Sequence, residues 1–286
     1  MLLERQAIAR RFGKAAPAYA DHAQLQLSVA KELHARLRSF ALKPARMLDL
    51  GAGTGNVAQF LRDDYRRAEI VALDLAPAML AQLRTRWPRR RIARVCADAE
   101  HLPFADHSFD VVQSNLMLQW CLPPQNVMNE VARVLRPDGL FLFSTFGPET
   151  LGELATSWAA VDDGLHVHAF PDMADLAAML SAAGFVEPVL DCDRLRRDVP
   201  SVAVLLGELR GLGAGNALAQ RRRSLTGARR YAAMVKHYEA LRQGDGRLPV
   251  SWQVIYGAAF AGPPRTLAGE TRIDASRITR RRREGR

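Results

Sequence analysis

The chain has 286 residues, 48% of them hydrophobic, and a formal net charge of +10. This hydrophobic content supports a sizeable core and excludes a chain dominated by disorder. Uncharged apolar stretches fall short of the roughly 18 to 20 residues of a membrane span, and the N-terminus lacks an apolar signal-peptide core. We therefore expect a cytoplasmic protein without a membrane partner.

The N-terminal residues predict a helical cover. Residues 5–23 read as a basic amphipathic helix, a break at Pro17, and then Tyr19 and His22. We expect residues 1–40 to form a lid over a cleft, because a lid excludes water from a reaction that competes with hydrolysis. The alternative is a helix that simply packs on the edge of a sheet.

The next part of the chain alternates strands and helices, which is typical of a doubly wound α/β fold with a mostly parallel sheet. We expect strands at 46–50, 69–74, 91–96, 109–114, 139–146, 185–191 and 249–260, and helices at 56–64, 77–86 and 125–135. Pro137-Asp138-Gly139 predicts a turn before the fifth strand. Residues 198–248 form an expected helical insertion before the last strand, and the main domain covers residues 1–264.

The C-terminal segment 265–286 is strongly basic, with eight arginines against three acidic residues. It has no interleaved aromatic residues for base stacking, so we expect a solvated, disordered tail and no nucleic-acid partner. Attraction of an acidic partner is the alternative. The cysteines Cys96, Cys121 and Cys192 are widely spaced, which predicts reduced, buried thiols, no disulfide framework and no metal site.

A glycine-rich turn predicts a nucleotide-like cofactor. The run at 46–50 leads into Gly51, Gly53 and Gly55, and Asp74 closes the next apolar run. Glycines allow positive φ and a close approach of the backbone to a ligand, and an acidic residue at the second strand end can hold both ribose hydroxyls. Asn56 stands where a dinucleotide fingerprint has its third glycine, which weakens a pyrophosphate interpretation.

A strand that ends in Asp49-Leu50-Gly51-x-Gly53-x-Gly55 resembles motif I of the class I S-adenosylmethionine (SAM) methyltransferases. The resemblance implies a Rossmann-like fold in which the turn passes under the methionine part of SAM and Asp74, with Leu75 beside it, holds the ribose. It also implies that Asp98 and Ala99 bind adenine, that Met79 packs on the nucleoside, and that Ser114 and Asn115 face the methyl group. Turn capping at Asp98 and Ser114, and core packing of Met79, are the structural alternatives.

Other segments are more specific. Five of them are similar to the malonyl-acyl-carrier-protein O-methyltransferases of biotin synthesis. They are Phe12-Gly13, Tyr19 with His22, the segment Ser114-Asn115-Leu116-Met117-Leu118-Gln119-Trp120-Cys121, His166-Val167-His168, and Leu209-Arg210-Gly211-Leu212-Gly213-Ala214. The similarity covers roughly residues 5 to 262. It implies transfer of a methyl group from SAM to the free carboxylate of a malonyl thioester on acyl carrier protein or CoA, with S-adenosylhomocysteine as the second product.

This chemistry needs no general base, because the malonyl carboxylate is already ionised at neutral pH. Alignment and exclusion of water are then the tasks of the site. Four residues are candidates for catalytic roles, as hydrogen-bond donors or as walls of the site: Tyr19, Asn115, Gln119 and Trp120. His22, His166 and Arg210 are candidates for recognition of the carboxylate.

The carrier protein that the resemblance implies is acidic, so a basic surface would speed its encounter with the enzyme. Candidates for that surface are Arg10, Arg11, Lys14, Arg221, Arg222, Arg223, Arg229 and Arg230, although solvated helix faces explain them equally well. We expect a monomer.

Three other functions compete with this one: methylation of a free small acid such as aconitate, a SAM-binding assembly factor that modifies a protein, and nucleic-acid methylation. The last is disfavoured, because Ser114-Asn115-Leu116-Met117 lacks the Asn/Asp-Pro-Pro-aromatic motif.

Overall fold

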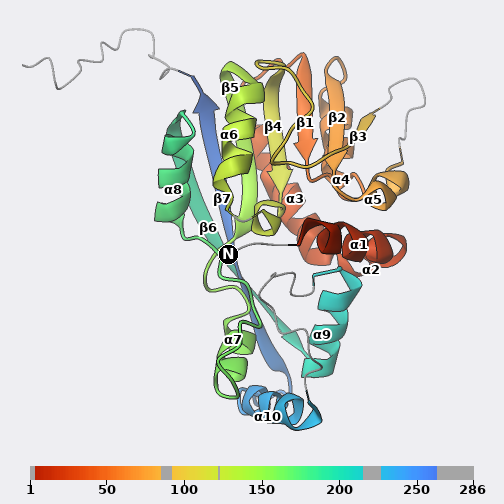
Figure 1. Cartoon of the computed structure of the whole chain (residues 1–286), viewed down its shortest axis with the longest axis vertical. Helices are drawn as coiled ribbons and strands as arrows, with labels where there is room; N and C mark the ends of the chain where they lie inside the picture. Colours follow the sequence, from red (N-terminus) through yellow and green to blue (C-terminus); the bar gives the residue numbers. More distant parts are fainter. Residues whose placement is uncertain (1–3, 85–91, 122, 215–226, 263–286) are drawn as a thin grey trace, which may run out of the picture.

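A computed structural model describes residues 4–84, 92–121, 123–214 and 227–262. Its centre is a seven-stranded sheet in the order β3-β2-β1-β4-β5-β7-β6 (Figure 1). The strands are β1 (Arg46–Leu50), β2 (Glu69–Asp74), β3 (Ala93–Cys96), β4 (Phe109–Asn115), β5 (Leu135–Phe146), β6 (Phe185–Val199) and β7 (Leu248–Ala261). The pairs among β1 to β5 are parallel, and β7 runs antiparallel to β5 and β6. The predicted doubly wound, mostly parallel sheet is confirmed.

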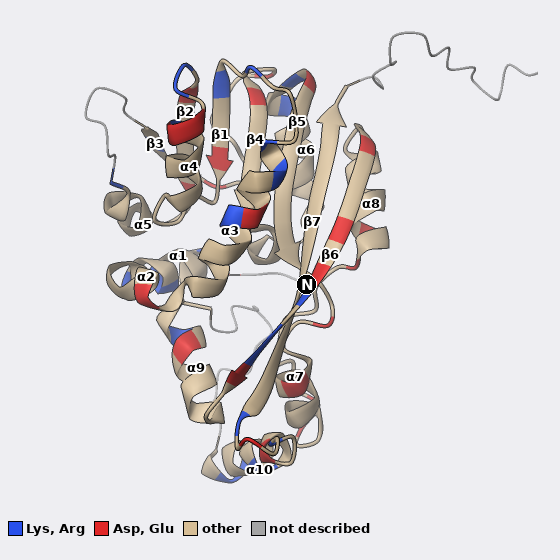
Figure 2. Ribbon diagram, turned by 180° about the vertical axis from the view of Figure 1, so that it is seen from behind, with Lys and Arg blue, Asp and Glu red and all other residues tan. Residues whose placement is uncertain are grey.

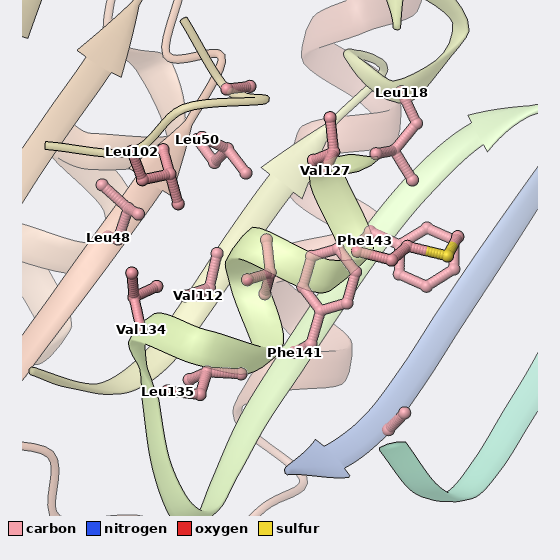
Figure 3. Packing of buried hydrophobic residues seen from close by; sticks show 14 of the residues in the cluster. Leu48, Leu50, Leu102, Val112, Leu118, Val127, Val134, Leu135, Phe141 and Phe143 are labelled. Atoms are coloured by element: carbon pink, nitrogen blue, oxygen red, sulfur yellow. The ribbon is translucent and has the colours of Figure 1, made fainter. Parts of the chain in front are cut away.

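Helices cover both faces of this sheet, as the continuous apolar character of its strands requires. On one face, α6 (Gln125–Val134) and α8 (Met173–Ala182) pack against side chains from β1, β4 and β5. Figure 3 shows this cluster, in which Val127 and Val134 face Leu48, Val112 and Phe141. On the other face lie α3 (Gln24–Leu37), α4 (Asn56–Asp64) and α5 (Pro77–Gln82). The two layers hold the carboxyl ends of β1, β2 and β4 rigidly at one edge.

The N-terminal segment lies across that edge. It contains α1 (Arg5–Ala15), the short 3-10 helix η1 (Ala16–Ala18) and α2 (Tyr19–His22) (Figure 1). Phe12 and Tyr19 pack with Ala16, Ala76 and Met79 in a small apolar cluster. The N-terminal helices therefore pack at the end of the sheet beside α5, an arrangement that both the lid and simple packing on the sheet edge would give.

The antiparallel pair of β6 and β7 extends beyond the rest of the sheet and carries a second, smaller core. Its register is continuous from Cys192 opposite Ile255 to Val199 opposite Leu248. The helices α7 (Gly152–Ala159), α9 (Val202–Gly211) and α10 (Ala228–Glu239) pack on this extension (Figure 1). Trp158, Leu205, Met234, Tyr238 and Trp252 are buried there. The predicted insertion 198–248 thus contributes α9 and α10 to a lobe that lies below the sheet edge.

Several predicted boundaries differ from the structure. The sixth strand was expected to end at 191 but continues to Val199, because it pairs with β7 along its whole length. The helix expected at 77–86 ends at Gln82, where Leu83 turns extended with ψ 117°. The expected turn at Pro137-Asp138-Gly139 lies inside β5, where Asp138 has φ 62° and the register with β4 shifts. The tail 265–286 and Arg221, Arg222 and Arg223 lie outside the described residues.

Candidate functional site

The glycine turn after β1 has the backbone that the sequence predicts. Gly51, Gly53 and Gly55 have φ angles of 77°, 55° and 89°. The amides of Gly51 and Ala52 both donate to the Leu73 carbonyl oxygen, at 2.8 and 2.9 Å. A Cβ on Gly53 would meet no atom within 4 Å, so the turn presents bare backbone to open space. Bare backbone beside a cavity is the property that a closely held ligand requires.

Asp74 connects this turn to the end of β2. One oxygen, Oδ2, accepts from the Gly53 amide at 2.8 Å, and Oδ1 accepts from the Ala76 amide at 2.8 Å. Burial raises the pKa of this carboxyl, while the amides of Ala76, Gly53 and Leu75 oppose that rise. Each carboxylate oxygen can accept more than one hydrogen bond, so the group can hold the turn and a sugar hydroxyl pair together.

Asp74 and the turn line a cavity of about 130 Å³, which we call the donor cavity. Seven of the predicted cofactor residues line it: Gly51, Gly53, Asp74, Leu75, Met79, Asp98 and Ala99. Its opposite wall comes from the N-terminal helices and includes Arg5, Ile8, Phe12 and Tyr19. The chemistry of these residues fits a nucleoside, since bare backbone, an acidic strand end and apolar walls converge on one space.

The loop after β3 is tied to the lid. Arg5 forms ion pairs with both Asp98 and Glu100, and the other Asp98 oxygen accepts from the Glu100 amide at 3.0 Å. The predicted adenine acceptor is therefore held by an arginine of α1. An adenine amine that donates to Asp98 must share this carboxylate with Arg5 or displace it.

Three predicted cofactor residues lie behind the wall of the donor cavity rather than on it. Gly55 stands at the start of α4, where a Cβ would lie 2.4 Å from the Leu83 side chain. The Ser114 hydroxyl donates to the Leu50 carbonyl oxygen at 2.9 Å. Asp49 is 1% exposed and accepts from the Ala58 amide at 2.8 Å. These residues shape the turn from behind.

Asp49 is also electrostatically unusual. Burial raises its pKa to about 8, and the charge of Asp74 adds to the rise, whereas the Ala58 amide lowers it. Its second oxygen, Oδ1, has no hydrogen-bond partner among the described residues. The next strand places Gln113 in register with it, and that amide is likewise buried without partners in the described part of the chain. The two buried polar residues are thus register neighbours on adjacent strands, and no hydrogen bond joins their side chains.

The raised pKa of Asp49 predicts how the stability of the protein depends on pH. An aspartate titrates near 3.9 in the unfolded chain, so between about pH 4 and pH 8 the folded protein holds one more proton at Asp49. The free energy of unfolding due to this residue is fully present below about pH 4 and falls as the pH rises to about 8. In Asp49→Asn we expect that fall to shrink by roughly 2 kcal/mol or more, since each unit of pKa shift corresponds to about 1.4 kcal/mol.

Urea denaturation at several pH values measures this difference. The exposed Asp163, changed to Asn, is the matched control and should follow the wild-type curve. Equal pH dependence in Asp49→Asn and the wild type would contradict the assignment.

A second, larger cavity adjoins the donor cavity and has a volume of about 750 Å³. We call it the acceptor cavity. It lies between the sheet edge and the lower lobe, with walls from α7, α9, the β6–β7 extension and the segment 166–170. Six residues line both cavities: Gln26, Gln119, Trp120, Phe146, Leu212 and Ala214. A group bound in one cavity can therefore meet a group bound in the other at this shared wall.

The predicted catalytic residues gather at or near the shared wall. Trp120 packs edge-on against Phe12 at 5.1 Å and His168 at 5.6 Å. The Gln119 amide donates to the Leu116 carbonyl oxygen at 2.6 Å and lies on both cavities. Tyr19 lies on the donor side, where burial and then the charge of Asp74 raise its pKa to about 12. Tyr19 is therefore a neutral phenol that can donate a hydrogen bond.

Asn115 lines the donor cavity, with its amide already engaged by the protein. Its Nδ2 donates to the Gln26 carbonyl oxygen at 3.2 Å, and its Oδ1 accepts from the Ser144 hydroxyl at 3.0 Å. The side chain thus fastens α3 to the ends of β4 and β5. This arrangement indicates positioning more than direct contact.

The three predicted substrate residues all line the acceptor cavity and not the donor cavity. His166 stacks on Trp158 with 3.8 Å between ring centroids, and its Nε2 lies 2.7 Å from Asp162 Oδ1. His22 lies against Gly211, where a Cβ would come within 2.4 Å of its ring. Arg210 is exposed, and its Nε donates to the Leu206 carbonyl oxygen at 3.0 Å.

Sequence reasoning missed Gln26 and Phe146. Gln26 carries a buried Oε1 without a hydrogen-bond partner among the described residues, and it stands on the wall that the two cavities share. Its position on α3 gave no motif that could have identified it. Phe146, the last residue of β5, could have been found, because it ends a strand at the same sheet edge as the glycine turn.

The thiols and the potential metal ligands lie apart from one another in the described part of the chain. All three cysteines are free; Cys121 is buried, but Cys96 is exposed and Cys192 half-buried, so the expectation of three buried thiols is wrong for two of them. Within residues 4–84, 92–121, 123–214 and 227–262, no cluster of three potential metal ligands occurs. None of the helices in these ranges is long and apolar enough to cross a membrane.

Comparisons with known proteins concern the family of the chain. Residues 48–143 match a family model described as a methyltransferase domain. The chain is 43% identical to a malonyl-[acyl-carrier protein] O-methyltransferase of Halorhodospira halophila, over 98% of this chain and 97% of that protein. It is 39% identical to a malonyl-[acyl-carrier protein] O-methyltransferase of Gallionella capsiferriformans, over 92% and 93% of the two chains.

Similarity to solved structures supports the fold. A SAM-dependent methyltransferase of Thermotoga maritima superposes with a TM-score of 0.52 and 16% identity, covering 88% of this chain and 99% of that one. The methyltransferase domain and the named relatives support S-adenosylmethionine as the methyl donor.

Proposed function

The chain belongs to the family of malonyl-[acyl-carrier protein] O-methyltransferases, and from this premise we propose that it methylates the free carboxylate of a malonyl thioester on acyl carrier protein or CoA. The observation that carries the proposal is the wall shared by the donor and acceptor cavities. A carboxylate bound in the acceptor cavity can approach a donor bound in the other cavity at this wall. The ester product would prime pimeloyl and biotin synthesis, and we place the reaction in the cytoplasm.

SAM supplies an electrophilic methyl group when bound, and the residues of this chain align the carboxylate with it. The acceptor is already anionic at neutral pH, so no side chain has to remove a proton. Opposite charges neutralise as the methyl group is transferred, and exclusion of water favours that step. Phe12, Tyr19 and Trp120 close the donor side, while neutral amides at Gln26 and Gln119 offer donors that do not form a tight ion pair.

The structure suggests how Gln26 contributes. Its backbone carbonyl oxygen receives the Asn115 amide, so a change of the side chain leaves that bond in place. A hydrogen bond to a charged group is worth about 1.5–3 kcal/mol. We therefore expect Gln26→Leu to lower kcat/KM for a malonyl thioester by roughly 10- to 100-fold, and the Kd of SAM to change much less.

Steady-state kinetics and SAM titration check this expectation. Gln82 is an exposed glutamine of α5 that lines neither cavity, so Gln82→Leu is the matched control. If Gln26→Leu weakened SAM binding as much as it lowered kcat/KM, the residue would belong to the donor site alone.

Substrate competition tests the function itself. The protein is incubated with SAM and with malonyl carrier protein, malonyl-CoA, free malonate or aconitate, and formation of S-adenosylhomocysteine is followed. We expect turnover with a malonyl thioester and little with the free acids. Preferential turnover of a free acid would replace this function with that of a small-acid methyltransferase.

The carrier protein would approach over basic side chains near the two cavities. Arg10 and Lys14 are exposed on α1 and Arg229 is exposed at the start of α10. Figure 2 shows basic residues interspersed with acidic ones over the ribbon, including α9 and α10. An acidic partner is therefore attracted by local groups of basic side chains rather than by a uniformly basic face.

A further inference from the structure

The acceptor cavity is much larger than the group that has to react in it. A malonyl unit has three carbons, whereas a volume of about 750 Å³ is in the range that holds a drug-sized ligand of roughly 300–1,000 Å³. The excess volume has mostly apolar walls, which include Trp158, Leu206, Leu209 and Trp252. The cavity therefore has room for a longer, partly apolar group that ends in the reacting carboxylate.

The two ends of this cavity differ in chemistry. The inner end is the wall shared with the donor cavity, where Gln119 is 4% exposed. The outer part carries three arginines, Arg196, Arg197 and Arg210, whose residues are all exposed. A ligand that extends from the inner to the outer part would have a neutral, apolar body and an anionic group at its far end.

Only one of these arginines has no acidic partner among the described residues. Arg196 lies 3.5 Å from Asp198, and Arg197 pairs with Glu208 and lies over the Trp252 ring at 5.5 Å. The Arg210 guanidinium donates from Nε to the Leu206 carbonyl oxygen one turn earlier. That bond holds the guanidinium at the preceding turn of α9, whereas Leu212 of the shared wall follows the end of α9. The terminal nitrogens of the guanidinium can still donate to an anion.

We propose that the acceptor cavity binds the 4′-phosphopantetheine arm of the thioester substrate, with the malonyl end at Gln119 and Trp120 and the phosphate at Arg210. This inference rests on the proposed function and adds a binding site to it. The arm has the required pattern, since it is a chain of amides and methylene groups with a thioester at one end and a phosphate at the other. Carrier protein and CoA both present it.

Binding of the arm can be measured without catalysis. Three of the four tryptophans of the chain, Trp120, Trp158 and Trp252, line the acceptor cavity, so tryptophan fluorescence reports its occupancy. We expect saturable quenching by 4′-phosphopantetheine and weaker binding of pantetheine, which lacks the phosphate. In Arg210→Ala the Kd of 4′-phosphopantetheine should rise roughly five- to tenfold, the effect of one exposed, charge-assisted contact. Arg210→Lys should recover part of the loss.

Kinetics provide a second, independent measurement. For Arg210→Ala, the ratio of kcat/KM with malonyl-4′-phosphopantetheine to kcat/KM with malonyl-pantetheine should fall roughly five- to tenfold. Arg66 is exposed in the connection from α4 to β2 and lines neither cavity, so Arg66→Ala should leave this ratio unchanged. Parallel assays with malonyl-CoA and malonyl carrier protein then show which source of the arm the enzyme prefers.

The outcomes separate the two proposals. If malonyl carrier protein is methylated but Arg210→Ala alters neither the Kd of 4′-phosphopantetheine nor the kinetic ratio, the assignment of the phosphate to Arg210 is wrong and the proposed function stands. Absence of quenching by 4′-phosphopantetheine in the wild type would overturn the arm site as a whole. If no malonyl thioester is methylated, the proposed function fails, whereas the fluorescence experiment still decides whether the cavity binds the arm.

Discussion

Replacement of Asp74 by alanine is expected to raise the Kd of SAM by a factor on the order of 10² to 10³. In the proposed site the variant would lose the carboxylate that accepts from the ribose hydroxyls, and hydrogen bonds to charged groups are worth about 1.5–3 kcal/mol each. The change also frees the amides of Gly53 and Ala76, which both donate to Asp74 at 2.8 Å. The glycine turn would then lose the side chain that fixes it to β2.

Isothermal titration with SAM measures this effect, and Asp74→Asn separates its two causes. Asparagine keeps one acceptor oxygen for a backbone amide but cannot accept on both sides, so we expect an intermediate loss of about tenfold. Asp106→Asn, an exposed change in the loop before β4, is the control and should bind SAM normally. Tight binding of SAM by Asp74→Ala would show that the ribose is held elsewhere.

Gly51→Val is expected to destroy both SAM binding and much of the stability of the protein. Gly51 has φ 77°, and a Cβ at this position would lie 2.2 Å from Met117 Cγ and 2.6 Å from Met117 Cβ. Left-handed backbone costs a β-branched residue on the order of 1–3 kcal/mol, and overpacking adds about 1–3 kcal/mol. Met117 would have to move, and with it the segment that leads to Gln119 and Trp120.

Urea denaturation and SAM titration should therefore both change in Gly51→Val. Gly207 is the matched control, because it lies within α9 and a Cβ there meets no atom within 4 Å. Gly207→Ala should slightly stabilise the protein, since alanine is favoured over glycine inside a helix by about 1 kcal/mol. A stable, SAM-binding Gly51→Val would contradict the close packing of the turn against Met117.

The sheet and the donor cavity were predictable because their signals are local. Glycines at 51, 53 and 55, and acidic residues at strand ends, occupy fixed places in a parallel sheet, and alternation of strands and helices fixes the edge at which they meet. The positions of Asp49 and Ser114 were harder to predict. Both stand at or near strand ends, but the Asp49 carboxylate accepts from the Ala58 amide and the Ser114 hydroxyl donates to the Leu50 carbonyl oxygen, so neither side chain lines the donor cavity.

The acceptor cavity depends on contacts between distant parts of the chain. Gln26 on α3, Trp120 after β4 and Leu212 after α9 meet only when the lower lobe is packed on the β6–β7 extension. The predicted end of the sixth strand at 191 hid this extension. Its later residues are largely polar and half exposed, so hydrophobic periodicity does not reveal their pairing with β7. Motif resemblance pointed to five residues that line this cavity, His22, Gln119, Trp120, His166 and Arg210, but not to Gln26, Phe146 or the size of the cavity.

The most direct test of methyl transfer to a malonyl thioester is the intact mass of the acceptor after incubation with SAM and catalytic amounts of the protein. We predict that malonyl carrier protein gains the mass of one methyl group in place of a proton, that S-adenosylhomocysteine forms in equal amount, and that Asp74→Ala gives neither. An unchanged mass of the malonyl carrier protein and of malonyl-CoA, with SAM bound normally by the wild-type protein, would contradict it.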